Sequence, residues 1–279
     1  MTAILAPAPR KPRVAHTLTT IPAKVTGSTW ITPRMIRLTI FSDQMAGFLR
    51  PGEPDQFATL IFPRQGQELY DLSGGVDWNT FSDIPFELRP EARNYTVRSF
   101  DLDAGTIDVD ILVHGGPGWG EKWAATVQPG ANIFLWGPRV AYNPFPNVTY
   151  HLLFCDECGL PAAASIIESL PMTAGGRLVA EVKDPVSIPA IPVRPGIETS
   201  WVFSGEAEPG EGSRLIDAVT EVPVPDALVY AWGGGEMKAM RQVGRHLRKH
   251  WGLKTASISA LGYWRLGVDA HGNKMKTSD

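Results

Sequence analysis

The feature that most limits the fold is a change in hydrophobic spacing about halfway along the chain. In the first half, apolar and polar residues alternate at every second position, as in Met35 to Phe41 and Ile107 to Val113. This spacing is typical of half-buried strands. After the two prolines in Tyr142 to Asn147, strand-like apolar runs alternate with helix-like segments. One chain therefore has to form two units of different architecture.

The first half predicts a small antiparallel β barrel. Short apolar runs bounded by Gly, Pro or Asp extend the strand pattern at Phe57 to Phe62, Tyr95 to Phe100 and Ala131 to Trp136. A polar, glycine-rich stretch from Gln65 to Glu91 separates two of them and is expected to be an excursion between strands. Many short strands without a strong helical period favour a barrel.

The second half predicts a parallel sheet with helices on its faces, because strands alternate there with helices. The boundary is expected near residue 146. The expected strands are Tyr150 to Phe154, Leu178 to Val182, Trp201 to Phe203 and Leu228 to Trp232. The expected helices are Pro161 to Leu170, Ser213 to Val219 with Ser213 as its cap, and Glu236 to Trp251.

Charge and hydropathy exclude several classes of function. A net charge of -3 at pH 7 argues against binding nucleic acid through bulk phosphate attraction. No apolar run approaches the roughly 18 residues that cross a bilayer. Near the N-terminus, Arg10, Lys11 and Arg13 follow the apolar pair Ile4 and Leu5, which reverses the order of a signal peptide. We therefore expect a cytoplasmic protein with no nucleic-acid or membrane partner.

Two stretches of the first half have residues suited to binding phosphate. The chain has neither the G-x-x-x-x-G-K-[ST] nor the G-x-G-x-x-G pattern. Arg93, Tyr95 and Thr96 open an expected strand, where an arginine can bind a phosphate and a tyrosine ring can pack on a flavin. A glycine cluster after His114 then leads into a short helix, as a loop of backbone amides for a diphosphate would.

These stretches resemble the siderophore-interacting protein family, which comprises flavin-dependent ferric-siderophore reductases of the ferredoxin-NADP reductase-like group. The resemblance lies in R-N-Y-T-V-R-S-F-D, H-G-G-P-G, K-W-A and G-P-R in the first half. It continues in C-D-E-C-G-L-P-A, Y-A-W-G-G-G-E-M and G-Y-W-R-L-G, and covers about Lys24 to Gly267. It implies a flexible tail (1–15), a six-stranded antiparallel FAD-binding barrel (16–145) and an NAD(P)H-binding α/β domain (146–279).

The resemblance also implies roles for individual residues. Thr96, Trp264 and Arg265 would be catalytic, with Trp264 shielding the flavin in a C-terminal segment that returns to it. Arg139 and Arg265 would attract an anionic ferric siderophore, and no metal site is implied. The residues implied to bind cofactors are Arg93, Tyr95, Thr96, Val97, His114, Gly116, Gly118, Trp119, Trp123, Ala124, Asp156, Glu157, Pro161, Glu236, Tyr263 and Trp264.

The chain departs from the family pattern at two places. In the turn that usually reads G-D-E-T-A, Cys155, Cys158 and Gly159 replace Gly, Thr and Ala, which leaves the details of nucleotide binding open. In the strand after Asp55, Phe57 and Thr59 stand where the family often has His and Lys, and that Lys belongs to a basic cluster associated with siderophore contact. The charge of the substrate is therefore open.

The implied reaction passes electrons from NADH or NADPH through FAD to a ferric siderophore and releases Fe(II). A flavin or ferredoxin-type reductase with another acceptor is the nearest alternative, and a ferredoxin could replace the nucleotide as donor. A non-catalytic siderophore carrier is the alternative from another class. A thiol oxidoreductase using Cys155 and Cys158 is a further one, although two reduced thiols without a role are expected. The sequence does not decide the siderophore or the oligomeric state.

One helix has two further features. His246 and His250 are four residues apart, a spacing that can bind a metal. They lie among basic residues and are expected instead to form part of a solvated surface. The same charges would favour the 2′-phosphate of NADPH if they faced the nucleotide. The basic residues are Arg241, Arg245, Arg248 and Lys249.

Overall fold

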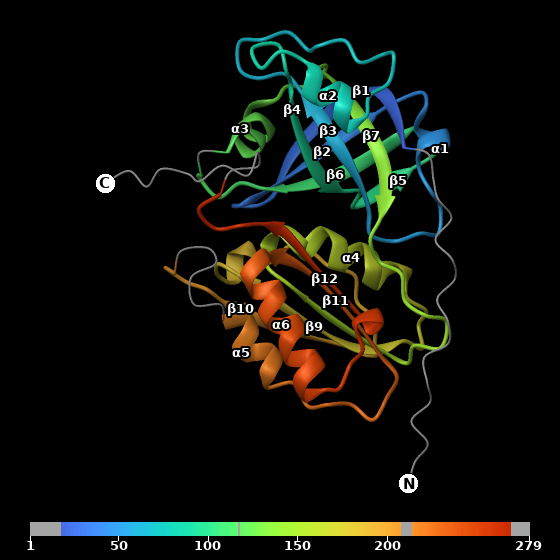
Figure 1. Cartoon of the computed structure of the whole chain (residues 1–279), viewed down its shortest axis with the longest axis vertical. Coiled ribbons are helices and arrows are strands. Elements are labelled where there is room, and N and C mark those ends of the chain that lie inside the picture. The colour runs from blue at the N-terminus through green and yellow to red at the C-terminus, as the bar shows by residue number, and fades with distance from the viewer. Residues whose placement is uncertain (1–17, 117, 208–213, 269–279) are drawn as a thin grey trace. The chain divides into compact units, whose positions relative to one another are not determined.

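The structure, a computed structural model, describes residues 18–116, 118–207 and 214–268. The chain divides between Ala141 and Tyr142 into two compact units, here called the barrel unit and the parallel-sheet unit (Figure 1). The expected N-terminal tail, 1–15, and the expected helix cap Ser213 lie outside the described residues. Among the helices of the described ranges, none is both long enough and apolar enough to span a bilayer.

The barrel unit contains an antiparallel sheet, as the alternating pattern predicts. Within the described residues its strand order is β4-β3-β7-β1-β2-β6-β5. Its elements are β1 (Thr19–Thr32), β2 (Met35–Phe41), α1 (Met45–Phe48), β3 (Gln56–Phe62), α2 (Trp78–Asp83), β4 (Glu91–Thr96), β5 (Ser99–Asp101), β6 (Thr106–Leu112), α3 (Trp119–Thr126) and β7 (Asn132–Val140).

A bent strand joins the two edges of this sheet. Only Val97 and Arg98 separate β4 from β5. The N–H of Val97 donates to Gln56 O on β3, and the N–H of Arg98 donates to Asp108 O on β6, both at 2.8 Å. Because β4 and β5 are halves of one bent strand, the described strands form the six-stranded antiparallel barrel that was expected.

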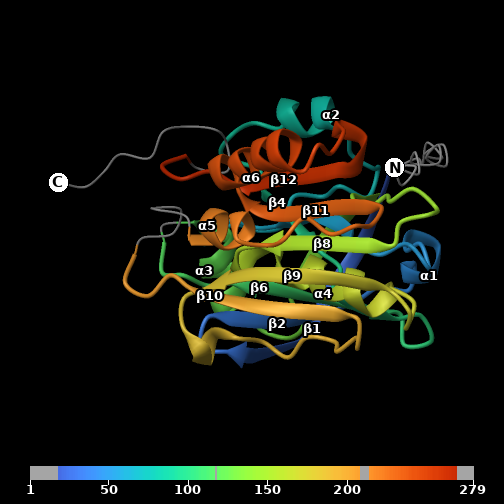
Figure 2. The ribbon, with the colours of Figure 1, turned by 90° about the horizontal axis from the view of Figure 1, so that it is seen from below.

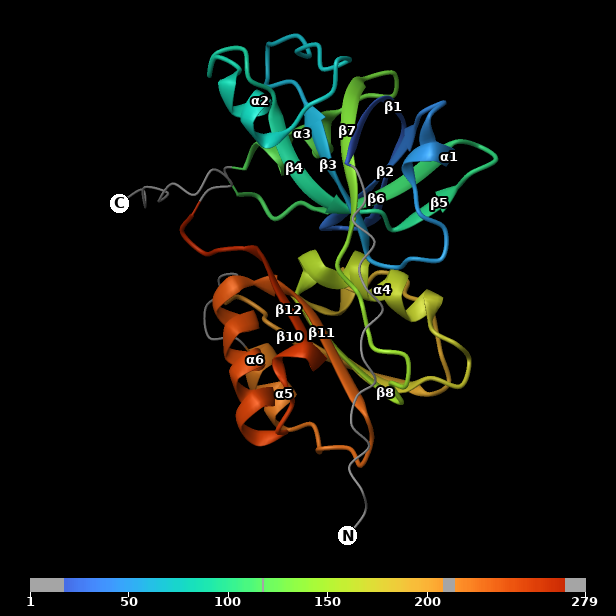
Figure 3. The same cartoon turned by 45° about the vertical axis from the view of Figure 1, so that its right-hand side comes forward.

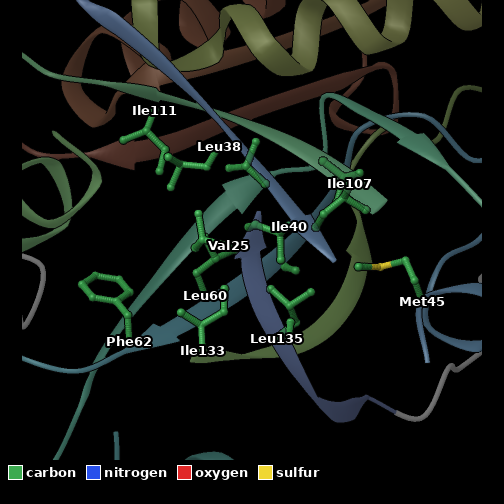
Figure 4. Packing of buried hydrophobic residues seen from close by; sticks show 14 of the residues in the cluster. Val25, Leu38, Ile40, Met45, Leu60, Phe62, Ile107, Ile111, Ile133 and Leu135 are labelled. Atoms are coloured by element: carbon green, nitrogen blue, oxygen red, sulfur yellow. The ribbon is translucent and has the colours of Figure 1, made fainter. Parts of the chain in front are cut away.

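Alternate residues of the strands fill the barrel (Figure 4). On β3, Leu60 and Phe62 are buried with inward residues of the other strands, such as Leu38 and Ile107. Ile61 lies on the opposite face and packs with residues of the excursion, including Phe81 on α2. The polar stretch between Gln65 and Glu91 therefore covers the outside of β3 and β7.

The parallel-sheet unit has the strand order β10-β9-β8-β11-β12 in its described part, with every pairing parallel (Figure 2). Its elements are β8 (Tyr150–Cys155), a 3-10 turn (Glu157–Gly159), α4 (Leu160–Ser169), β9 (Gly175–Val182), a 3-10 turn (Pro185–Ser187), β10 (Ile197–Phe203), α5 (Arg214–Thr220), β11 (Val229–Glu236), α6 (Met237–His250), a 3-10 turn (Thr255–Ser257) and β12 (Ile258–Trp264).

Helices cover both faces of this sheet (Figure 3). On β8, Leu153 and Cys155 pack on the side of α4. Leu152 and Phe154 pack on the other side, with residues of α5 and α6. Because both faces are covered, β8 is apolar at successive positions and shows no alternation.

The first residue of the parallel-sheet unit is anchored by a buried histidine. Tyr142 Oη and His151 Nδ1 form a hydrogen bond of 2.6 Å, and both side chains are buried. Burial lowers the pKa of His151 to about 4. His151 is therefore neutral in the folded chain near pH 7.

This pair predicts a loss of stability in acid. The unfolded chain takes up a proton near the ordinary histidine pKa of 6.5, whereas the folded chain does not do so until about pH 4. Neutral His151 therefore contributes its full share to the free energy of unfolding above pH 6.5. That contribution falls by about 3 kcal/mol as the pH is lowered to 4. In His151→Asn, an amide oxygen replaces Nδ1 and cannot titrate. Urea unfolding at pH 7 and pH 4 should show wild type losing about 3 kcal/mol relative to this variant, and a constant difference would contradict the assignment.

Candidate functional site

In the barrel unit, β4 presents Arg93 and Tyr95 on one side of the strand. The Arg93 guanidinium is held by Glu91, whose Oε2 lies 2.6 Å from Arg93 Nη2. Glu91 is almost fully buried and its other oxygen pairs with Arg64 Nε at 2.8 Å. Arg93 is thus fixed by a buried carboxylate, and its side chain stays partly exposed.

The start of α3 packs directly on these two residues. A Cβ built on Gly120 would lie 2.5 Å from Tyr95 Oη and 3.4 Å from Arg93 Cγ. A larger residue would force Tyr95 or the helix to shift, because real Cβ atoms essentially never come within 3.0 Å of a heavy atom outside their own residue and its chain neighbours. The structure therefore brings together the two stretches that the sequence singled out, the strand with Arg93 and the glycine cluster.

The first turn of α3 and Arg93 form a candidate anion site. Gly118 is the residue before the helix, and no side chain caps the N–H groups of the first turn. Such N–H groups and the positive end of the helix dipole favour a phosphate. Arg93, whose Cγ lies close to Gly120 in this turn, brings a guanidinium to the same region of the unit. This donor set fits the diphosphate of a dinucleotide such as FAD.

Part of the expected amide loop is occupied by the chain itself. The backbone N–H groups of His114 and Gly115 donate to Glu121 Oε2 at 2.7 and 3.0 Å. Glu121 is buried, and its imidazole neighbour His114 is partly exposed with Nε2 3.9 Å from the same oxygen. Sequence reasoning did not single out Glu121, because only the folded loop shows which amides it reaches.

The remaining expected FAD residues differ in exposure. Trp119 is exposed. Trp123 stacks on Phe62 with ring centroids 4.2 Å apart, and Ala124 is fully buried in the barrel core. Thr96 and Val97 are also buried, at the bend between β4 and β5. The side chains of Trp123 and Ala124 therefore attach α3 to the barrel.

Arg139 on β7 lies beside Phe57 and Thr59, the two residues of β3 that depart from the family pattern. Its Nη1 donates to Thr59 Oγ1 at 3.2 Å, and its guanidinium is 5.9 Å from the ring of Phe57. The guanidinium also stacks on Trp136 at 4.4 Å. Burial lowers the pKa of Arg139. This arginine therefore has a hydroxyl and two aromatic rings as neighbours.

In the parallel-sheet unit, Asp156 joins the carboxyl ends of neighbouring strands. Its Oδ2 accepts from the backbone N–H of Glu236 and from the indole N–H of Trp264, both at 2.8 Å. Its Oδ1 accepts from the N–H of Cys158 at 2.9 Å. Burial raises the pKa of Asp156 to about 6, although these hydrogen bonds oppose the rise. The expected residues Asp156, Glu236 and Trp264 therefore meet at one place.

That place is the point where the strand order reverses. β8 lies between β9 and β11, so the chain turns to opposite sides of β8 in its two halves. Ligands of open parallel sheets bind outside the carboxyl ends of the strands at such a point. Glu236 also caps α6 by accepting from the N–H of Ala239 at 2.9 Å.

The glycine triplet belongs to β11, whereas the expected strand ended at Trp232. A Cβ on Gly233 would meet the Phe154 ring at 2.1 Å, and one on Gly234 would meet Tyr263 Cζ at 2.9 Å. A Cβ on Gly235 would lie 2.6 Å from Asp156 Oδ2. The absence of side chains at the triplet therefore lets Phe154, Tyr263 and Asp156 pack directly against the backbone of β11.

The other expected residues surround this end of the sheet. Glu157 is buried in the 3-10 turn after β8, and Pro161 is buried in the first turn of α4. Tyr263 is partly exposed at the end of β12, and Arg265 follows it with an exposed side chain. Cys155 is fully buried, which raises its thiol pKa well above the ordinary range, and Cys158 is partly buried.

The basic face of α6 is exposed, as expected for a solvated surface. The rings of His246 and His250 stack 4.8 Å apart. Burial, followed by the charge of His250, lowers the pKa of His246. Among the described residues, no group of three or more His, Cys, Asp or Glu could hold a metal ion. The exposed basic residues are Arg241, Arg245, Arg248 and Lys249.

The similarity of the chain to known families covers both units. Residues 24–142 match the siderophore-interacting FAD-binding domain, and residues 148–267 match the siderophore-interacting protein family. A ferric vibriobactin reductase of Vibrio cholerae is 24% identical over 85% of this chain and 86% of its own length. An NADPH-dependent ferric-chelate reductase of Escherichia coli is 25% identical over 82% of this chain and 86% of its own.

Similar folds are known from solved structures. The crystal structure of a siderophore utilization protein from T. fusca superposes with a TM-score of 0.78 at 30% identity. The match covers 91% of this chain and 95% of that chain. A barrel followed by a parallel sheet is therefore an arrangement already seen in a siderophore-related protein.

The close packing of the glycine triplet predicts a specific loss of stability. In Gly235→Ala, the new methyl group displaces the Asp156 carboxylate and weakens its bonds to Glu236 and Trp264. We expect a loss of about 2–4 kcal/mol in the free energy of unfolding. Gly244→Ala on α6 is the matched control, because its Cβ would meet atoms only at 3.5 Å or beyond. It should change stability by no more than about 1 kcal/mol. Equal losses in the two variants would contradict this account.

Proposed function

The chain belongs to the siderophore-interacting protein family, and from this membership we propose that it is an FAD-dependent ferric-siderophore reductase of the cytoplasm, using NADH or NADPH. The observation that carries the proposal is the anion site in the barrel unit, where Arg93 lies beside the uncapped first turn of α3. Two relatives named as reductases of ferric chelates support iron as the acceptor.

The barrel unit would bind FAD through a few groups. Arg93 and the N–H groups at the start of α3 would hold the diphosphate, and the Tyr95 ring would pack against the flavin. Glu91 keeps the guanidinium in place, since it forms an ion pair with Arg93. When bound, FAD supplies a two-electron store that can be emptied one electron at a time.

The parallel-sheet unit would bind the nicotinamide nucleotide. Its strands reverse order beside Asp156 and Glu236, where nucleotides bind in folds of this kind. The exposed basic residues of α6 would favour the additional phosphate of NADPH. One of the two ferric-chelate reductases is named as NADPH-dependent, which supports the same donor.

The acceptor would be a ferric chelate with hard oxygen ligands, which suit Fe(III) far better than Fe(II). Reduction by one electron therefore loosens the iron. Arg139 and the exposed Arg265 would attract an anionic chelate. Because Thr59 and Phe57 surround Arg139, a chelate of low charge suits this position better than a highly charged one.

The proposal predicts reductase activity that needs added or bound FAD. With NADPH or NADH, a ferric hydroxamate and a ferrous trap, we expect Fe(II) to form only when FAD is present.

Arg93→Ala should raise the dissociation constant of FAD about tenfold or more, because a charge-assisted bond to phosphate is lost. Lys24→Ala, which removes an exposed charge from β1, is the control and should leave that constant unchanged. Equal FAD affinity in wild type and Arg93→Ala would overturn the assigned site. A colourless protein that binds the ferric chelate without reducing it would identify a carrier instead.

A second prediction separates flavin chemistry from thiol chemistry. Burial raises the pKa of the Cys155 thiol, so little of the reactive thiolate forms near pH 7. Cys158→Ser removes one thiol of the pair at a position that is only partly buried. We expect Fe(II) release at about the wild-type rate, within roughly twofold, because no step needs a dithiol. Loss of all activity in Cys158→Ser would favour a thiol oxidoreductase.

A further inference from the structure

A buried carboxylate lies within the anion site of the barrel unit. Glu121 is the third residue of α3, and only 7% of its surface is exposed. Its Oε2 accepts the backbone N–H groups of His114 and Gly115. Its Oε1 is buried without a hydrogen-bond partner. A carboxylate oxygen in that state is costly unless a further group comes to bind it.

The unpartnered oxygen points into the glycine-rich loop before α3. A Cβ on Gly116 would lie 2.8 Å from Oε1, and one on Gly118 would lie 3.8 Å from it. The next glycine, Gly120, packs on Tyr95 and Arg93. Glu121 therefore places a negative charge beside the groups that would hold a diphosphate.

This arrangement reduces the ability of the loop to bind an anion. Glu121 already accepts two backbone N–H groups of the loop. The remaining N–H groups lie beside its carboxylate, which has the same sign of charge as a phosphate. Like charges a few ångströms apart repel strongly in a partly buried site. A phosphate that binds there has to overcome that repulsion.

We propose that Glu121 is an internal anion of the phosphate-binding loop, which weakens the binding of the flavin diphosphate and makes FAD an exchangeable cofactor of this chain. The inference rests on the proposed function, since it assumes that FAD binds at Arg93 and α3. Glu121 sets the affinity for FAD and takes no part in the reaction.

A purely structural role makes a different prediction. A glutamate at the third position of a helix often accepts backbone N–H groups from the residues before the helix, and so fixes the loop. Glu121→Gln separates the two roles. Its amide oxygen can still accept from His114 and Gly115, while its NH₂ group takes the place of the unpartnered Oε1 and can donate to a phosphate. A structural role predicts no gain in affinity from this change.

The test is a fluorescence titration of wild type and Glu121→Gln with FAD and with riboflavin, which lacks the diphosphate. We expect the dissociation constant of FAD to fall about tenfold or more in the variant, since a repulsive charge is replaced by a donor. That of riboflavin should stay within about twofold, because no phosphate is involved. Wild type should lose FAD on desalting, whereas the variant should remain yellow. Glu87→Gln, which makes the same charge change at an exposed position, is the control and should match wild type.

Each other outcome has a definite meaning. Unchanged or weaker FAD binding in Glu121→Gln would overturn the inference, as would equal changes for FAD and riboflavin. A thermal unfolding curve of each variant shows whether it is folded. If no flavin binds to wild type or to the folded variant, the proposed function itself fails, and the inference fails with it.

Discussion

The bend at Val97 and Arg98 is the constraint on which the barrel and its anion site depend. The chain before the bend bonds to β3 and the chain after it bonds to β6, so a single segment closes the sheet. The same segment carries Arg93 and Tyr95, and closure sets them against the start of α3. The geometry of the candidate cofactor site thus follows from how the barrel is closed.

Buried carboxylates organise both units. Glu91 holds two arginines at the start of β4, and Glu121 accepts two backbone N–H groups of the loop before α3. Asp156 holds neighbouring strand ends of the parallel sheet, and Glu236 caps α6. Each accepts N–H groups that would otherwise be unsatisfied, which offsets the cost of burying its charge. Glu121 differs from Glu91 in one respect: Glu91 Oε2 lacks a hydrogen bond but forms an ion pair with Arg93, whereas Glu121 Oε1 is buried without a hydrogen-bond partner.

The sequence predicted well those features that depend on local spacing. Alternation defined β2 to the residue, and the apolar positions of α6 defined that helix to within a residue at each end. The strand β1 was missed because Pro22 interrupts its alternation and much of its second half is exposed. The strand β12 was missed because it is mostly only partly buried, and the glycine triplet concealed the end of β11.

The site was predictable only where one segment carries the chemistry. Arg93, Asp156 and Glu236 were found from their own stretches, and the structure shows their surroundings. The partners Glu91 and Glu121 were not found, because their roles depend on contacts made by folding. The bond between Trp264 and Asp156 spans 108 residues, a separation at which no local pattern shows contact.

The measurement that tests the central claim most directly is an anaerobic absorbance titration of the FAD-loaded protein. NADPH and NADH are added separately, followed by a ferric hydroxamate and a ferrous trap. The account predicts that at least one nucleotide bleaches the flavin band, and that the band returns in step with the absorbance of the ferrous complex. A flavin band that stays unchanged with both nucleotides, or a bleached band that the ferric chelate does not restore, would contradict it.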